Sequence, residues 1–194
     1  MNKNEVKRVF RMFTIADYDK EEEFLREQHK AGFKFVRFQF PGFYYFEACE
    51  PEDVVYQLDF NDNIRKQDKA DYLQLYKDTG WEYMFDVFEW SYFRKSASLE
   101  EEEPTIFTDK ESKIELINRV FKRRMLPIII AFFCCIIPEI IYMSHQWTKD
   151  GSDKMHALAF LVVYVILFLI YLGIFIHCGG GLHRLKKDYE NGLK

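Results

Sequence analysis

Two long apolar segments near the C-terminus constrain this chain more than any other feature. Residues 157–176 are 20 uncharged residues, and a helix that rises about 1.5 Å per residue crosses a hydrocarbon core of about 30 Å over that length. Residues 125–143 form a second apolar segment, which holds one acid, Glu139. The sequence therefore predicts a transmembrane hairpin. Its expected parts are a first helix at 125–143, an extracytoplasmic loop at 144–154, a second helix at 155–178 and a tail at 179–194.

Basic residues around the two segments predict the orientation of the hairpin. Lys122, Arg123 and Arg124 precede the first segment, and a second basic group follows the second segment at residues 183–187. The intervening loop carries only two basic residues, both lysines. Because short loops rich in Lys and Arg stay in the cytoplasm, we expect a two-pass protein of the cell inner (cytoplasmic) membrane with both termini cytoplasmic.

An internal repeat of about 48 residues organises the part before the membrane segments. Phe24-Leu25 corresponds to Tyr72-Leu73, and Gly32-Phe33 corresponds to Gly80-Trp81. Each copy reads strand, helix, strand, strand, because apolar residues alternate with period two in the strand segments and a glycine follows each helical segment. The sequence predicts an α+β domain at 1–99, in which two βαββ units pair through their first strands. We expect one mainly antiparallel sheet with both helices on one face.

Two segments connect this domain to the membrane. Residues 100–107 form an acidic linker. Residues 108–124 predict an amphipathic stalk helix, because Thr108 and Glu111 have the spacing of a capping box and the apolar residues that follow recur on one face. We expect this helix either to run directly into the first membrane helix or to lie along the bilayer surface.

Charge and motifs exclude several classes of function. Residues 1–103 carry 15 Lys and Arg against 23 Asp and Glu, and phosphate binding needs a basic face, so we expect no direct nucleic-acid binding. The sequence has no Gly-rich phosphate loop, nucleophile elbow or His-Glu-x-x-His motif, so we do not expect an enzyme. The four cysteines include no C-x-x-C pair, which argues against a zinc site or a disulfide framework. We expect neither a metal nor another cofactor.

The aromatic content, 18% of all residues, suggests a candidate ligand site in the predicted sheet. Aromatic rings on strands offer flat stacking surfaces, and nearby carboxylates add charge, so such a cleft suits a small lipophilic or cationic ligand. The candidate cleft residues are Tyr44, Glu47, Tyr56, Asp59, Trp81, Tyr83, Trp90 and Tyr92. The alternative is that most of these aromatic residues simply fill the core of a small domain.

Glu139 is the acid within the first apolar segment. An ionisable residue at membrane depth often marks a transport or proton pathway. Here it lies five residues before Ser144, near the expected outer interface. We favour a snorkelling carboxylate, or one hydrogen-bonded to Tyr164 or His156 across the hairpin. Two helices alone enclose no pore, so transport would require a homo-oligomer or a partner.

The tandem units resemble, in topology, the duplicated architecture of the GyrI-like and SOUL domains, whose cleft binds small molecules in several members. The ordered landmarks of the chain are Ala-Gly-Phe (31–33), Tyr-Tyr-Phe-Glu (44–47), Tyr-Gln-Leu-Asp-Phe (56–60), Asp-Tyr-Leu (71–73), Gly-Trp-Glu (80–82), Trp-Ser-Tyr-Phe-Arg-Lys (90–95) and Phe-Thr-Asp-Lys-Glu-Ser-Lys (107–113). Together they are similar to the DUF2812 family, found mainly in Firmicutes, which usually pairs this module with C-terminal membrane helices. Family members are often encoded beside PadR-like transcription regulators, and the resemblance implies no particular reaction.

These observations lead to one functional expectation and one alternative. We expect a membrane-anchored cytosolic ligand-binding or sensory module that regulates or sequesters a cytoplasmic protein, and the resemblance implies a PadR-like regulator as that partner. The other expected partners are the lipid bilayer and a small lipophilic or cationic ligand. The alternative is a structural adaptor subunit of a membrane protein complex that binds no small molecule.

Overall fold

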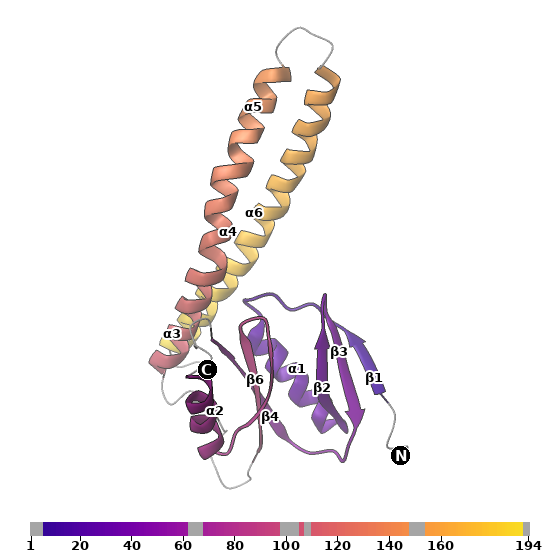
Figure 1. Cartoon of the computed structure of the whole chain (residues 1–194), viewed down its shortest axis with the longest axis vertical. Helices are drawn as coiled ribbons and strands as arrows, with labels where there is room; N and C mark the ends of the chain where they lie inside the picture. Colours follow the sequence, from indigo (N-terminus) through magenta and orange to yellow (C-terminus); the bar gives the residue numbers. More distant parts are fainter. Residues whose placement is uncertain (1–5, 62–67, 98–104, 107–109, 148–153, 192–194) are drawn as a thin grey trace. The chain divides into compact units, whose positions relative to one another are not determined.

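The structure is a computed structural model that describes residues 6–61, 68–97, 105–106, 110–147 and 154–191 (Figure 1). The chain divides into two compact units, residues 1–116 and 117–194. The first is called the head here and the second the helical unit. Most of the predicted acidic linker lies outside the described residues, as does Thr108 of the predicted capping box.

The head repeats one βαββ unit. The first copy contains β1 (Val6–Phe10), α1 (Tyr18–Lys30), β2 (Phe33–Gln39) and β3 (Phe43–Ala48). The second copy contains β4 (Val54–Phe60), α2 (Lys69–Asp78), β5 (Glu82–Val87) and β6 (Trp90–Ser96). Gly32 and Gly80 follow the two helices at equivalent positions with φ of 87° and 83°, a left-handed conformation that glycine adopts without steric cost. The predicted α+β class and its duplicated unit are confirmed.

The strands form two sheets rather than the single predicted sheet. Sheet A has the order β1-β3-β2 and sheet B the order β4-β6-β5, and all pairs are antiparallel. Each first strand pairs with the last strand of its own repeat, so that Val9 lies opposite Tyr44 and Leu58 lies opposite Tyr92. The predicted pairing of β1 with β4 is wrong, because the two strands belong to different sheets. One backbone donor of β4 bonds to α1 instead: the Leu58 N–H donates to Glu22 Oε1 at 2.7 Å.

The two helices lie on opposite faces of sheet B, which corrects the prediction that both share one face. Neighbouring residues of a strand point to opposite sides of the sheet. Tyr92 belongs to the core cluster that contains Phe24 and Leu25 of α1, whereas Phe93 packs against the Tyr76 ring of α2. Sheet B is therefore apolar on both faces, and β4 is buried along almost its whole length. Figure 1 shows α1 between β4 and β2.

Helix α1 connects the two sheets through Glu21, a carboxylate buried in the core. Glu21 Oε1 accepts hydrogen bonds from the hydroxyl of Tyr44 on β3 at 2.8 Å and from the hydroxyl of Tyr92 on β6 at 2.6 Å. Burial raises the pKa of Glu21, and the two hydroxyl donors partly offset that rise. At the start of α1, Tyr18 stacks on Trp90 with ring centroids 5.5 Å apart. One helix of the first repeat thus binds both sheets.

The apolar part of the chain begins with a long uninterrupted helix. Its successive segments are α3 (Lys110–Val120), the π-helical segment η1 (Phe121–Met125), α4 (Leu126–Ala131), the π-helical segment η2 (Phe132–Ile136) and α5 (Ile137–Trp147). Each π-helical segment ends just before a proline, Pro127 or Pro138. Proline lacks an N–H and its ring clashes with the carbonyl four residues earlier, and a wider turn accommodates both effects. The predicted stalk helix therefore continues directly into the first apolar segment.

Helix α6 (Lys154–Glu190) packs against α5 to form a hairpin. The Phe132 ring lies 5.2 Å from the ring of Phe168 and 5.4 Å from that of Phe175, measured between centroids. The helix continues through the glycines at 179–181, so the predicted helix end at Cys178 is wrong. Each glycine costs about 1 kcal/mol relative to alanine, and the burial of side chains on both sides, such as Cys178 and Leu182, offsets that cost.

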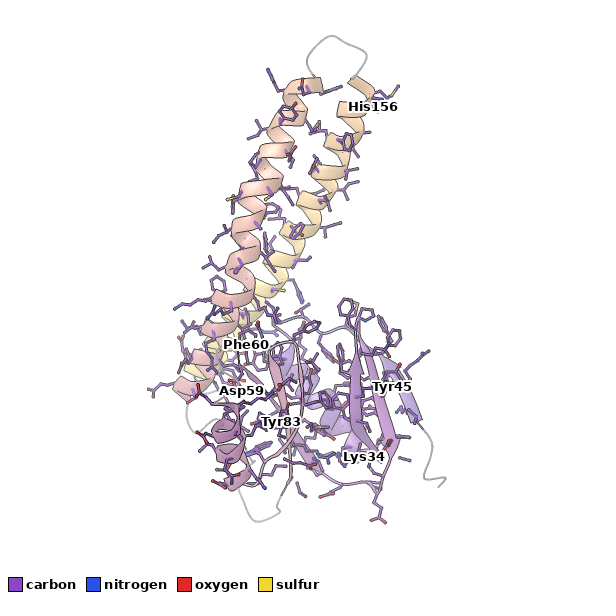
Figure 2. All side chains as sticks on the ribbon, in the orientation of Figure 1. Lys34, Tyr45, Asp59, Phe60, Tyr83 and His156 are labelled. Atoms are coloured by element: carbon purple, nitrogen blue, oxygen red, sulfur yellow. The ribbon has the colours of Figure 1, made fainter. Side chains whose placement is uncertain are left out.

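Both apolar helices are long and apolar enough to cross a membrane. The most apolar 18-residue stretch has a mean hydropathy of 2.3 in Glu111–Trp147 and of 2.9 in Leu158–Glu190. Large apolar side chains along α6, such as Phe160 and Leu169, are exposed, which lipid tolerates and water does not. Figure 2 shows side chains along both helices, with His156 near one end of α6. These features fit a two-pass membrane protein.

We predict that Glu21→Ala in the full-length protein in detergent lowers the free energy of unfolding of the head by about 2–4 kcal/mol, because two buried tyrosine hydroxyls lose their acceptor. Tyr92→Phe removes one donor without leaving a buried hydroxyl unpaired, so it should cost about 1 kcal/mol. Urea unfolding followed by tryptophan fluorescence measures both. Glu23→Ala is the matched control on the exposed side of α1 and should stay within about 0.5 kcal/mol of the wild type. Equal effects of Glu21→Ala and Glu23→Ala would contradict the stabilising role of the two hydrogen bonds to Glu21.

A pH dependence follows from Glu22. Burial raises its pKa from 4.5 to about 8, while the Leu58 N–H and the Lys113 charge act in the opposite direction. Between these two values the unfolded chain ionises Glu22 and the folded head keeps it protonated, so the unfolded state binds fewer protons. The stability of the wild type should therefore fall, relative to Glu22→Gln, as the pH rises through this window. Urea titrations of both proteins at several pH values test this, and parallel stability profiles would contradict it.

Candidate functional site

The structure does not bring the eight predicted cleft residues together. Tyr44, Tyr56 and Tyr92 are buried in the core cluster around α1, and Trp81 is buried in a second cluster against α2. Sheet B separates the two clusters. These aromatic residues are part of the core on both sides of the sheet, as the alternative interpretation has it.

The other predicted residues are also held by partners within the head. Buried Asp59 accepts hydrogen bonds from the hydroxyls of Tyr72 at 3.0 Å and Tyr76 at 3.2 Å. Figure 2 shows Asp59 and Tyr83 in the second repeat, and the Tyr83 ring lies 5.8 Å from that of Phe93.

Of the last two predicted residues, Trp90 packs against the core cluster around α1, and Glu47 lies on sheet A. The Trp90 ring lies against Tyr18 and Phe60. Glu47 forms an ion pair with Lys34 at 3.2 Å on the outer face of sheet A. None of the eight predicted residues lines the larger hollow described next.

The head has a polar pocket of about 400 Å³ where its two repeats meet. It opens to solvent and draws on α1, on β2, on the connection between β3 and β4, and on β4, β5 and β6. The lining residues are His29, Lys34, Cys49, Glu50, Glu52, Val54, Gly80, Glu82, Arg94, Lys95 and Ser96. Charged groups of both signs therefore converge on one hollow, and Lys34 marks its first-repeat side in Figure 2.

A chain of hydrogen bonds forms part of this polar pocket. Arg94 donates through Nε and Nη2 to the two carboxylate oxygens of Glu82, at 2.7 and 2.8 Å. Arg94 also contacts the hydroxyl of Tyr56, and that hydroxyl lies 2.7 Å from His29 Nδ1 on α1. The chain thus runs from the β5–β6 hairpin to the helix that joins the two sheets.

The charges in the chain set the protonation of its members. Arg94 holds the pKa of Glu82 below its usual range, and Glu82 raises the pKa of Arg94. Burial, with the Arg94 charge second, lowers the pKa of His29 from 6.5, so this imidazole is neutral at pH 7. Burial raises the pKa of Tyr56. At neutral pH the chain therefore contains one ion pair followed by two neutral groups.

Sequence reasoning missed this pocket because its lining is polar and scattered along the chain. Cys49, Glu50 and Glu52 lie in a connection between strands, and Lys95 reaches back to donate to the Thr79 carbonyl at 3.2 Å. The available signal was the repeat itself, because its junction joins the two halves. Among the described residues, no group of three or more His, Cys, Asp and Glu side chains is placed to hold a metal ion.

Glu139, the predicted intramembrane polar residue, lies in α5 on an exposed side of the helix. Tyr164 and His156, its predicted partners, both lie on α6. His156 lies two residues after the start of that helix, and Tyr164 lies about 15 Å along the axis from the same start. That the carboxylate snorkels, or pairs with Tyr164 or His156, stays a prediction.

Comparison with known proteins identifies a family. No curated protein and no solved structure matches the chain. The model of a family described as a protein of unknown function, DUF2812, matches residues 17–130, from just before α1 into the first apolar helix. The match covers more than half of the chain and includes the duplicated unit except for β1. The chain belongs to the DUF2812 family.

Proposed function

We propose that this protein is a membrane-anchored sensory module whose cytosolic head binds a small polar ligand and regulates a cytoplasmic protein. The observation that carries the proposal is the polar pocket, because its lining comes from both repeats. In small-molecule sites, a few convergent polar groups fix the orientation of the ligand and provide specificity.

The chemistry of the polar pocket favours a ligand that carries a carboxylate, and a zwitterion most of all. Arg94, Lys34 and Lys95 supply cationic donors, and Arg94 offers the planar fork that suits a carboxylate. Glu50 and Glu52 supply the opposite charge for an ammonium group. The lipophilic cation expected from the sequence fits less well, because the aromatic rings that would bind it fill the core instead.

Ligand binding has a direct route to the rest of the head. A carboxylate that reaches Arg94 competes with Glu82, which forms a two-pronged ion pair with that arginine. A shift of Arg94 alters its contact with Tyr56, and Tyr56 is bonded to His29 of α1. Ligand binding thereby changes the contacts of α1 with the two sheets. Allosteric coupling requires such a difference in contacts between the ligand-bound and ligand-free states.

The membrane and a protein partner complete the proposed function. The Lys and Arg residues before the first apolar segment and after the second support a cytoplasmic head on a two-pass inner-membrane anchor. The frequent neighbourhood of DUF2812 members and PadR-like regulators supports such a regulator as the partner. Tethering alone would sequester that partner at the membrane. The proposed activity is binding, without catalysis or a cofactor.

A structural adaptor without a ligand is the second candidate function. It is favoured by the outer face of sheet A, where Val6 and Phe10 of β1 are more than half exposed. The equivalent positions of sheet B, Val54 and Leu58, are buried under α1. A protein subunit could cover the outer face of sheet A in a complex. It would then pack on sheet A as α1 packs on the equivalent face of sheet B.

We predict that the full-length protein in detergent is stabilised by a member of a panel of amino acids and di- and tricarboxylates. A probe at about one hundred times its Kd raises the free energy of unfolding by about 2.7 kcal/mol. Arg94→Gln should weaken binding of that probe at least about tenfold, because a charge-assisted carboxylate contact is lost. The matched control is Lys77→Gln on the exposed surface of α2. Absence of a shift with every probe, or a shift that survives Arg94→Gln unchanged, would contradict ligand sensing.

We further predict that the head is cytoplasmic and firmly anchored. Protease added to sealed inverted inner-membrane vesicles should remove the head, whereas protease added to intact spheroplasts should leave it whole. Alkaline carbonate should leave the protein in the membrane pellet, because two apolar helices hold it there. Cleavage of the head in spheroplasts, or release of the protein by carbonate, would contradict this topology.

A further inference from the structure

Four large apolar side chains are exposed at the ends of three segments of the head. Phe40 and Met12 are each 72% exposed, Phe88 is 71% exposed and Phe10 is 53% exposed. Phe40 and Phe88 occupy equivalent hairpin turns, β2–β3 and β5–β6, and their ring centroids lie 6.3 Å apart. The Arg11 N–H donates to the Gly42 carbonyl at 2.9 Å, which brings the end of β1 beside the first turn. These four residues are called the tip patch.

Folding gives no reason for the phenylalanine at position 88. Its φ is 57°, in the left-handed region where a bulky side chain crowds the backbone and glycine or asparagine is favoured. The Phe88 ring lies largely in solvent, so no core contact offsets that strain. An exposed aromatic side chain on a strained turn indicates a role outside folding.

Two arginines lie beside the tip patch on the outer face of sheet A. The Arg8 guanidinium lies 5.1 Å from the Phe43 ring centroid, and the Phe43 ring is 5.0 Å from that of Phe10. The Arg37 guanidinium lies 4.2 Å from the Tyr45 ring centroid. Within the described part of the chain, neither arginine forms an ion pair. Although Glu89 neighbours Phe88 and the head as a whole is acidic, this end of sheet A presents positive charge beside apolar rings.

We propose that the tip patch docks on the surface of an anionic lipid bilayer. Phe40 and Phe88 enter the headgroup region, where aromatic side chains are favoured, and Arg8 and Arg37 face lipid phosphates. The chain already carries two helices able to cross a membrane, so a bilayer lies within reach of the head at all times. A twofold dimer through the same patch is disfavoured because it would bring the arginines of two copies together.

The test uses the full-length protein in nanodiscs, with the native cysteines replaced and one new cysteine carrying a fluorescent dye. Met12→Cys places the dye in the tip patch, and Gln74→Cys on exposed α2 is the control. Nanodiscs contain spin-labelled lipid in either phosphatidylcholine or phosphatidylglycerol. We expect quenching at position 12 in phosphatidylglycerol, weaker quenching in phosphatidylcholine or high salt, and none at position 74.

Two sets of variants make the test specific. Arg8→Gln and Arg37→Gln should each reduce the docked-to-undocked ratio about fivefold in phosphatidylglycerol. Phe88→Asn should raise the midpoint of unfolding, because asparagine suits the left-handed turn, and at the same time reduce quenching at position 12. If Phe88 had only a structural role, the substitution would not raise the midpoint of unfolding while it reduces quenching.

Several outcomes would overturn the proposal. One is equal quenching at positions 12 and 74. Another is quenching at position 12 that does not depend on lipid charge or salt concentration, and a third is unchanged quenching in Phe88→Asn. Burial of the dye without lipid quenching, increasing with protein concentration, would assign the tip patch to a second copy or to another protein. The polar pocket has no part in any of these measurements, so they are independent of ligand sensing.

Discussion

The structure of the head depends on one helix, α1, that packs against both sheets. Glu21 of α1 accepts hydrogen bonds from Tyr44 of sheet A and Tyr92 of sheet B. The next residue, Glu22, accepts a hydrogen bond from the Leu58 N–H of β4 in sheet B. A three-stranded sheet with one helix is a small unit that exposes much apolar surface by itself. Because α1 buries part of both sheets, two such units become one core.

Sequence patterns predicted the elements of the head better than their arrangement. Period-two alternation and the glycines at 32 and 80 located strands and helix ends, because these signals depend on neighbouring residues alone. Which strand edge meets which depends on contacts between the repeats. One such contact is the bond from the Leu58 N–H of β4 to Glu22, a residue whose place in the sequence predicts a surface charge. The same limit explains the aromatic residues. The strand pattern predicts Tyr56 and Trp81 in one cleft, although they belong to clusters on different faces of sheet B.

The duplication also explains why the two repeats differ in exposure. In the second repeat, Val54 and Leu58 of β4 are covered by α1, whereas Val6 and Phe10 at the equivalent places of β1 face solvent. The first repeat therefore offers surface for contacts outside the head. The polar pocket lies at the junction of the repeats, and its charged lining was not recognised because those residues come from many short segments. The proposed sensing and the proposed membrane contact thus use different parts of one duplicated fold.

The most direct test of the account is whether the two repeats open as one unit. Native-state hydrogen exchange of the full-length protein in nanodiscs reports the free energy of opening for amides in β3 and β6, the central strands of the two sheets. If α1 joins the sheets as described, both strands exchange through the same opening, with equal free energies and equal denaturant dependence. Exchange of β6 through a lower-energy opening, while β3 stays protected, would contradict the central role of α1.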